Sequence, residues 1–179
     1  DGAEQATITL QLKDVNGNDI TTSGVEVTFA STLGTLSATT TTTGAGGTVS
    51  VTLTSTTSGP ADVTATVDHD NDGGTTPEQP VTNGSPVQVT FNPGAISVAA
   101  TGTELTGTNL TRIADGAEQA TITLQLKDVN GNDITTNGVE VTFTTTLGTL
   151  SATTTTTGPG GTVGVTLTST TTGTADVTA

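Results

Sequence analysis

Apolar and polar residues alternate along much of the chain. In residues 6–13, ATITLQLK, the apolar residues Ile8, Leu10 and Leu12 occupy every second position. An extended strand directs successive side chains to opposite faces, so this pattern is typical of a strand with one buried face. The same alternation recurs at residues 24–29, 48–54, 61–67 and 86–91, between turn sequences rich in Gly, Pro and Asn. Apolar residues nowhere recur at helical spacing over a helix-length stretch, so the sequence predicts an all-β protein.

Three further segments carry weaker patterns. The Thr-rich run at residues 37–43 has strand propensity but no apolar face, which predicts an edge strand that is soluble on both sides. Ile96 and Val98 begin another short alternation, which predicts the start of a strand at residues 96–98. Residues 101–114 are predicted to form a looser connector.

The chain contains one sequence twice. Residues 115–179 repeat residues 1–65 at a constant offset, and a repeat of this fidelity indicates tandem structural units. About seven strands per repeat period predict tandem immunoglobulin-like β-sandwiches, held by aliphatic packing because the chain has no Cys and no Trp. The seven differing pairs are Ser23/Asn137, Ala30/Thr144, Ser31/Thr145, Ala45/Pro159, Ser50/Gly164, Ser58/Thr172 and Pro60/Thr174.

The repeat of the sequence and the folding unit need not begin at the same residue. The shortest candidate linker between two strands is Asn92–Ala95, which predicts immunoglobulin-like domains at 1–95 and 96–179. On this prediction the domain at 1–95 lacks its first strand. The domain at 96–179 lacks its last strand, because Ala179 corresponds to Ala65 and precedes the equivalent of the strand at 86–91. The alternative is a domain that begins at Asp1, with 96–114 as a long linker.

Composition excludes several classes of function. The chain has a formal net charge of −14 and only three basic residues, so nucleic acid is not an expected partner. It has no apolar run of the ~18 residues that a membrane span needs, so this segment is not expected to insert into a membrane. The absence of Cys and the single His69 leave no constellation for nucleophilic catalysis, and no enzymatic activity is predicted.

One acidic loop suggests a cation. Asp68, Asp70 and Asp72, in the sequence DHDNDG, are spaced like the first half of a calcium-binding loop. The Glu that closes such a loop would stand at position 79, where this chain has Gln79, and Glu78 is one residue early. Calcium bound by these three aspartates is therefore one prediction, and no other cofactor is expected. A solvated acidic loop is the alternative.

The stretches 14–19 and 128–133 also carry oxygen-bearing side chains around Asn-Gly. Because Asn-Gly favours positive φ and Asp and Asn cap their own turns, we predict tight turns here rather than metal sites. The neighbouring Lys13 and Lys127 could in principle form isopeptide crosslinks with Asn. They are predicted to point outward, away from the core, which argues against such crosslinks.

An ordered set of motifs carries a family resemblance. The set is similar to the bacterial immunoglobulin-like domain of the invasin/intimin kind, which occurs in tandem in surface adhesins, and the similarity covers both copies. The resemblance implies a first strand before Ala-Asp-Gly and a final strand ending in Phe. The sequence departs from the usual pattern at Asp19 and Asp133, where the family commonly has Pro, and in its longer acidic loop. The motifs are Ala114–Gly116, Ala120–Asn132, Gly138–Phe143, Leu147–Ser151, Gly160–Thr170 and Gly173–Ala179.

The resemblance implies an extracellular, structural role at the bacterial cell surface. The expected function is an extender repeat, part of a stalk or fibre that projects the distal binding domain of an adhesin, with neighbouring repeats of the same chain as partners. The alternative is a binding or self-associating module in which the repeats engage a glycan, a host receptor or a neighbouring copy. The absence of Trp and Tyr favours the extender over glycan binding.

Overall fold

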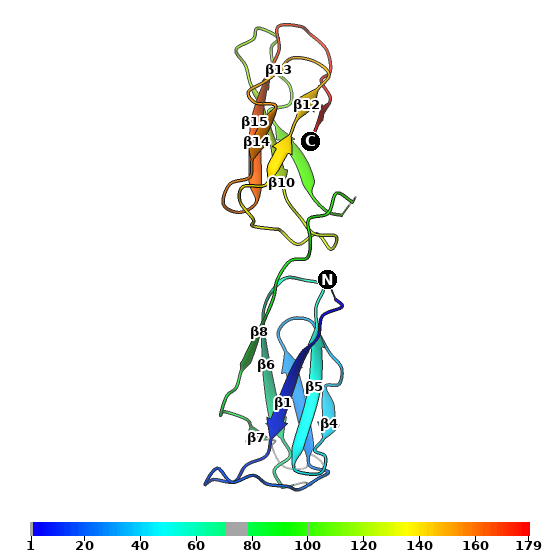
Figure 1. Cartoon of the computed structure of the whole chain (residues 1–179), viewed down its shortest axis with the longest axis vertical. Coiled ribbons are helices and arrows are strands. Elements are labelled where there is room, and N and C mark those ends of the chain that lie inside the picture. The colour runs from blue at the N-terminus through cyan, green and yellow to red at the C-terminus, as the bar shows by residue number, and fades with distance from the viewer. Residues whose placement is uncertain (1, 71–78, 100) are drawn as a thin grey trace. The chain divides into compact units, whose positions relative to one another are not determined.

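The computed structural model describes residues 2–70, 79–99 and 101–179, which form strands, turns and loops (Figure 1). No helix long and apolar enough to cross a bilayer occurs among these residues. The prediction of an all-β fold is confirmed. The chain divides into two compact units, Asp1–Asn92 and Pro93–Ala179, and each is described by itself.

The first unit has two facing sheets. One has the strand order β1-β5-β3, and the other has the order β4-β2-β6-β7, with β8 also paired to β6. The predicted edge strand is confirmed, because the all-Thr strand β4 lies at the end of its sheet. The strands are β1 (Ala6–Gln11), β2 (Glu26–Ser31), β3 (Thr35–Leu36), β4 (Thr40–Thr42), β5 (Thr48–Thr54), β6 (Gly59–Val67), β7 (Gln79–Pro80) and β8 (Val87–Phe91).

The inward positions of the period-two strands build the core of the first unit. Val27 and Phe29 of β2 pack in one cluster with Leu53 of β5 and Val63 of β6, and all four side chains are buried. Their polar neighbours along each strand face outward, as the burial pattern of β5 shows by alternating between exposed and buried residues. The aliphatic core predicted from the alternation is therefore present.

The second unit repeats the first sheet and adds a strand to it. Its main sheet has the order β13-β15-β10-β9, and two shorter pairs, β11 with β14 and β12 with β16, face it. Phe143 and Leu126 lie in its buried core. The strands are β9 (Glu104–Thr108), β10 (Ala120–Gln125), β11 (Glu140–Thr142), β12 (Thr144–Thr145), β13 (Thr149–Leu150), β14 (Thr154–Thr156), β15 (Thr162–Thr168) and β16 (Val177–Thr178).

The predicted strand at residues 96–98 is wrong. The first strand of the second unit is β9, inside the segment predicted to be a connector. The backbone at Ser97 instead forms a loop: Ser97 accepts a hydrogen bond from the N–H of Thr103 (2.7 Å), and Val98 is 94% exposed. Two apolar residues are too few to impose a buried face, and the pairing edge of β10 takes the more extended Glu104–Thr108 segment instead.

The two units differ at their outer strands. Over the described residues, β1 pairs only with β5, whereas its sequence equivalent β10 pairs with both β15 and β9. Conversely, β6 pairs with β2, β7 and β8, whereas its equivalent β16 pairs only with β12. The predicted domains at 1–95 and 96–179, each lacking one outer strand, stay a prediction that the following experiment addresses.

We expect that a chain extended after Ala179 by a copy of residues 66–91 will have a more stable second unit. The added strand would cover Val177, which is partly exposed, whereas its equivalent Val63 is buried beside β8. Burying one such side chain contributes about 2 kcal/mol, which raises the melting temperature by several degrees. Phe143 reports on the second unit and Phe29 on the first, so NMR of the two rings separates the transitions.

The matched control is the same extension with Thr in place of the added equivalents of Val87, Val89 and Phe91. This control adds the same length and hydrogen-bonding capacity without the apolar face. The domain prediction fails if both extensions shift the Phe143 transition equally, or if neither does.

Candidate functional site

Two of the three predicted calcium ligands, Asp68 and Asp70, directly follow β6. Asp68 is buried, and its backbone N–H donates to the carbonyl of Glu26 (3.0 Å), while Asp70 is exposed in the turn that follows. Asp72 lies outside the described residues. Among the residues with described positions, no three His, Cys, Asp or Glu side chains gather in a group that could hold a metal ion. Calcium at Asp68, Asp70 and Asp72 therefore stays a prediction.

If the acidic loop binds calcium, the cation will stabilise the first unit by mass action, because it binds the folded state preferentially. A calcium concentration of ~100 times the dissociation constant contributes about 2.7 kcal/mol, which raises the melting temperature by several degrees. The combined substitution Asp70→Asn with Asp72→Asn should abolish this shift. Calorimetry in calcium and in chelator measures it, with Glu4→Gln plus Glu26→Gln as the control for a general loss of charge. A parent chain that melts at one temperature in both solutions would leave the solvated-loop alternative.

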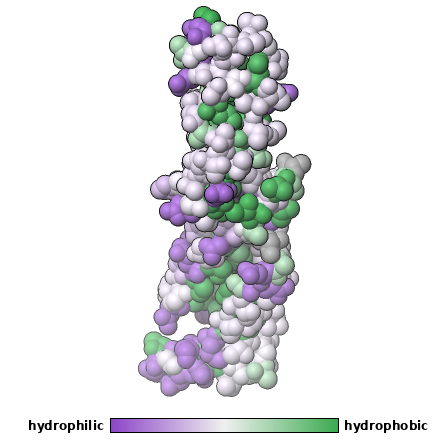
Figure 2. Space-filling model, turned by 45° about the horizontal axis from the view of Figure 1, so that its top comes forward, coloured by the Kyte–Doolittle hydropathy of each residue, from purple (hydrophilic) through white to green (hydrophobic). Residues whose placement is uncertain are grey.

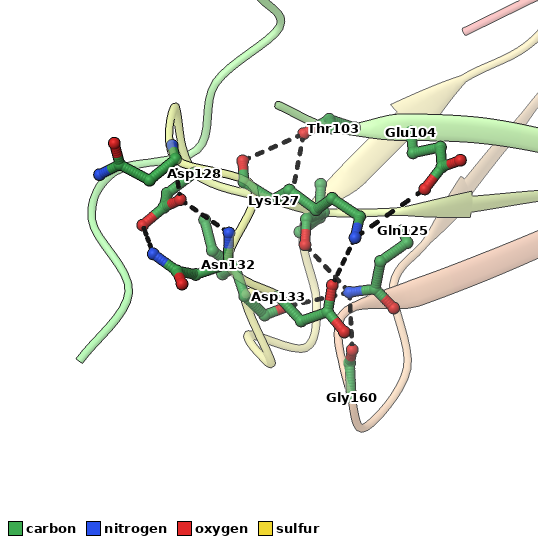
Figure 3. A network of polar contacts seen from close by, with 11 residues as sticks. Thr103, Glu104, Gln125, Lys127, Asp128, Asn132, Asp133 and Gly160 are labelled. Atoms are coloured by element: carbon green, nitrogen blue, oxygen red, sulfur yellow. Dashed lines mark hydrogen bonds and ion pairs between the residues drawn. The ribbon is translucent and has the colours of Figure 1, made fainter. Parts of the chain in front are cut away.

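The most densely bonded polar site is the turn that follows β10 in the second unit. Asp128 has a relative exposure of 0%, and its carboxylate accepts four hydrogen bonds. Oδ1 accepts from the backbone N–H groups of Asn130 and Asn132, both at 2.9 Å. Oδ2 accepts from Nδ2 of Asn132 (2.8 Å) and from the backbone N–H of Gly94 (2.8 Å). Figure 3 shows the Asp128 carboxylate beside Asn132 in this network.

The environment of Asp128 sets its protonation. Burial opposes ionisation and alone would raise the pKa of the carboxyl group. The hydrogen bonds from Asn132, Gly94 and Asn130 outweigh that effect and lower the pKa from 3.8 to about 2. The buried group is therefore an anion at neutral pH, stabilised by amide donors. Each carboxylate oxygen already accepts two hydrogen bonds, so this turn is saturated by protein donors, in agreement with the prediction of a turn rather than a metal site.

The fourth donor comes from the segment that precedes β9. We call residues 93–99 and 101–103 the leading segment. Besides the Gly94 bond, the N–H of Ser97 donates to the carbonyl of Lys127 (2.9 Å), and Oγ1 of Thr101 donates to the carbonyl of Val129 (2.6 Å). The N–H of Lys127 donates in return to Oγ1 of Thr103 (3.3 Å). The leading segment is thus bonded along the stretch 127–129 before it enters β9.

The side chain of Lys127 pairs with two carboxylates beside the same turn. Its Nζ lies 2.9 Å from Oδ1 of Asp133 and 3.8 Å from Oε2 of Glu104 in β9 (Figure 3). The hydrogen bond that Lys127 donates to Asp133 is the main cause that raises the pKa of Lys127. The lysine is held by carboxylates at the surface, which fits the predicted outward orientation and offers no support for a crosslink to Asn.

The equivalent turn of the first unit makes the same internal bonds without the leading segment. Asp14 accepts from the N–H groups of Asn16 (2.9 Å) and Asn18 (2.8 Å) and from Nδ2 of Asn18 (2.9 Å), and the residue is exposed. Lys13 pairs with Asp19. The sequence thus predicts the turn in both copies. No sequence pattern predicts that the leading segment docks on this turn. The donors from Gly94 and Ser97 are backbone N–H groups, which any residue except Pro carries.

Replacement of Asp128 by Asn should destabilise the second unit by about 1–3 kcal/mol, since an amide NH₂ group would face donors that the carboxylate now satisfies. The matched variant Asp14→Asn should destabilise the first unit less, because that turn is exposed and lacks the fourth bond. Urea unfolding followed through the Phe143 and Phe29 rings measures both. Equal effects of the two substitutions would show that the Gly94 bond and the burial contribute nothing.

Asp128 also predicts a pH dependence. Its folded pKa of about 2 lies below the ordinary value of 3.8. It therefore contributes stability above about pH 4, and this contribution is lost as the pH falls through the folded value. Between pH 4 and pH 2 the second unit of the parent should lose stability more steeply than the second unit of Asp128→Asn. Parallel curves in this range would contradict the assignment of the low pKa to Asp128.

Comparison with known proteins relates both units to one family. The family model of invasin domain 3 matches residues 1–94 and, again, residues 97–179. No curated protein matches the chain significantly. Among solved structures, the D0–D1 domains of intimin are 32% identical over 99% of this chain and 82% of that chain, with a TM-score of 0.39.

Two further structures align with nearly the whole chain. Invasin, a bacterial integrin-binding protein, is 33% identical over 99% of this chain, with a TM-score of 0.42. InvD of Yersinia pseudotuberculosis is 29% identical over the same share, with a TM-score of 0.57. The chain spans only 32% of the invasin structure and 48% of the InvD structure.

Proposed function

The chain belongs to the invasin domain 3 family, and from this membership we propose that it is a structural extender repeat, part of a stalk or fibre that projects the distal binding domain of a bacterial cell-surface adhesin. Its site of action is outside the cell, it performs no catalysis, and its partners are neighbouring repeats of the same chain. Two units of one family in direct succession support this proposal.

The observation that carries the proposal is the anchoring of the leading segment. Strand β8 of the first unit ends at Phe91, and Gly94 is already bonded to Asp128 in the second unit. Only Asn92 and Pro93 lie between these two points. The three residue steps from Phe91 to Gly94 span at most about 11 Å, and Pro93 has a restricted φ. A connection this short limits the freedom of one unit relative to the next, which is the property that a stalk needs.

The surface composition supports an extender over a binding module. Binding hot spots are enriched in Trp, Tyr and Arg. This chain has no Trp, no Tyr and Arg112 as its single arginine, and Arg112 is paired with Glu118. Phe29 and Phe143 are buried in the two cores, and Phe91 is partly buried. Aromatic platforms for a glycan are therefore not offered by these side chains.

If the connection is stiff, spin labels on the two units will show a narrow distribution of distances. The chain has no native Cys, so Thr39→Cys and Thr153→Cys, two exposed and equivalent positions, allow specific labelling for pulsed electron paramagnetic resonance. Insertion of a Gly-Ser linker between Asn92 and Pro93 is the control and should broaden the distribution. Asp128→Asn, which loosens the leading segment, should give an intermediate width.

A distribution in the parent that is as broad as that of the Gly-Ser variant would refute the stiff connection and remove the main support for an extender. The alternative, in which the repeats themselves bind a glycan, a receptor or a neighbouring copy, would then be the next to test.

A further inference from the structure

Four Asn-Gly dipeptides occur in the chain, and each is a point at which an Asn side chain can react with the backbone. Gly has no Cβ, so its backbone nitrogen approaches the side-chain amide of the preceding Asn with little hindrance. All four Asn residues are exposed, so exposure alone does not distinguish the sites. Figure 2 shows hydrophilic residues, in purple, at the surface of the face in view, where water reaches them. The dipeptides are Asn16-Gly17, Asn83-Gly84, Asn130-Gly131 and Asn137-Gly138.

The reaction of such a dipeptide needs a free N–H on the Gly. A base removes the proton, and the nitrogen forms a bond to Cγ of the Asn, which expels the side-chain amide as ammonia and closes a succinimide ring. Water then opens the ring on one side or the other and leaves aspartate or isoaspartate, so one water is consumed for each ammonia released. A hydrogen bond donated by the Gly N–H opposes the first step, because it must break before the nitrogen can lose its proton.

The Gly N–H is engaged in three of the four dipeptides. Gly17 donates to the carbonyl of Asp14 (3.0 Å), Gly131 to the carbonyl of Asp128 (3.1 Å), and Gly138 to the carbonyl of Thr157 (2.7 Å). Gly84, in the loop between β7 and β8, differs from these three. Across the residues that the structure describes, its N–H donates no hydrogen bond.

Two of the dipeptides form a matched pair. Residues 82–84 and 136–138 have the same sequence, Thr-Asn-Gly. Gly84 and Gly138 have similar φ angles, 71° and 76°, and both have open space where a Cβ would stand. The Asn and the Gly are exposed in both stretches. The stretches therefore share sequence, exposure and this backbone angle, and they differ in the bonding of the Gly N–H.

Further bonds hold the backbone on both sides of Asn137. Oγ1 of Thr157 donates to the carbonyl of Thr136 (2.9 Å) and accepts from the N–H of Val139 (3.1 Å). Thr157 is 3% exposed, so water competes little for these bonds. The backbone around Asn137 is thus fixed in the bonded arrangement, which keeps the nitrogen of Gly138 from attack.

We propose that Asn83 is the site at which the folded chain modifies itself, by cyclisation with Gly84 and hydrolysis to aspartate and isoaspartate. The other three Asn-Gly dipeptides are protected by the hydrogen bonds of their Gly N–H groups. The proposal concerns local chemistry in the first unit and is independent of the role as an extender.

The modified loop lies between two anchored points. The N–H of Val81 donates to the carbonyl of Ala65 (2.9 Å) before it, and β8 begins at Val87 after it. Conversion adds one negative charge between β7 and β8, and isoaspartate also adds one methylene to the backbone. Both changes fall in the loop, so we expect β7 and β8 to stay paired with β6.

Mass spectrometry of the full chain tests the site. The chain is incubated folded, at mildly alkaline pH, in water enriched in heavy oxygen, and each Asn is then followed by peptide mapping with fragmentation. Heavy oxygen enters only during the incubation, so it excludes earlier conversion. Asn83 should convert about fivefold or more faster than Asn137, the ratio that corresponds to one ordinary backbone hydrogen bond.

The unfolded chain is the internal control. In urea the two Thr-Asn-Gly stretches lose their difference in bonding, so Asn83 and Asn137 should convert at similar rates. Equal rates in the folded chain would overturn the proposal. An unchanged ratio in urea would also overturn it, because the fold would then not be the cause.

Two variants change one site each. Asn83→Gln should suppress conversion at residue 83, because the longer side chain would have to close a larger ring. Thr157→Val removes the hydroxyl group beside Asn137 but keeps its shape, and it should speed conversion of Asn137 without changing that of Asn83. The NMR signals of the Phe143 ring report whether the second unit stays folded. Unchanged conversion of Asn137 in this folded variant would count against protection by these bonds, and the comparison within the parent chain does not depend on the variant.

Discussion

Each unit depends on one antiparallel ladder, β1 with β5 in the first and β10 with β15 in the second. The ladder joins six residue pairs in the same register in both units, from Ala6 with Leu53 and Ala120 with Leu167 onward. It sets which alternate residues face the core and brings the turn at Asp14 or Asp128 to the end of the sheet. Because the first partner occupies only one edge of this strand, the burial of its aliphatic residues depends on what covers the other edge.

The two copies of this ladder show that residues of identical sequence can differ in burial. Asp14 and Asp128 make the same bonds within their turns, yet one is exposed and the other is buried with a pKa of about 2. The difference arises from the leading segment, which lies outside the repeated sequence. The bonds within the turn lower the pKa of Asp14 as well, so ionisation is shared by the two copies. The burial of the repeated residue and the fourth hydrogen bond depend instead on the segment that precedes it.

Sequence predicted the strands whose alternation reports a buried face, such as β5 and β6, and it predicted the Asn-Gly turns. It missed β9, because Glu104–Thr108 is exposed along its whole length and carries one apolar residue in five. An edge strand of this kind forms because the backbone N–H and C=O groups of its neighbour are available for hydrogen bonds. Its own pattern of apolar residues does not predict it. The hydrogen bond from Gly94 to Asp128 could not be predicted for a related reason. Its donor is a backbone N–H group, which does not depend on the residue type. The acidic residues 68–72 were conspicuous in sequence, and calcium binding by Asp68, Asp70 and Asp72 stays a prediction.

One continuous stretch of chain both bonds to the turn at Asp128 and supplies the strand that pairs with β10. Within the second unit, residues 93–99 and 101–103 bond to Asp128 and its neighbours, and residues 104–108 continue directly into the strand that covers β10. Loosening the attachment therefore also weakens the coverage of the core, and loss of β9 would release the attachment. In the proposed stalk, the stiffness of each junction and the stability of the unit that follows it would therefore be coupled. One of the four hydrogen bonds that the buried Asp128 carboxylate accepts comes from Gly94, so this carboxylate is fully satisfied only while the leading segment is docked.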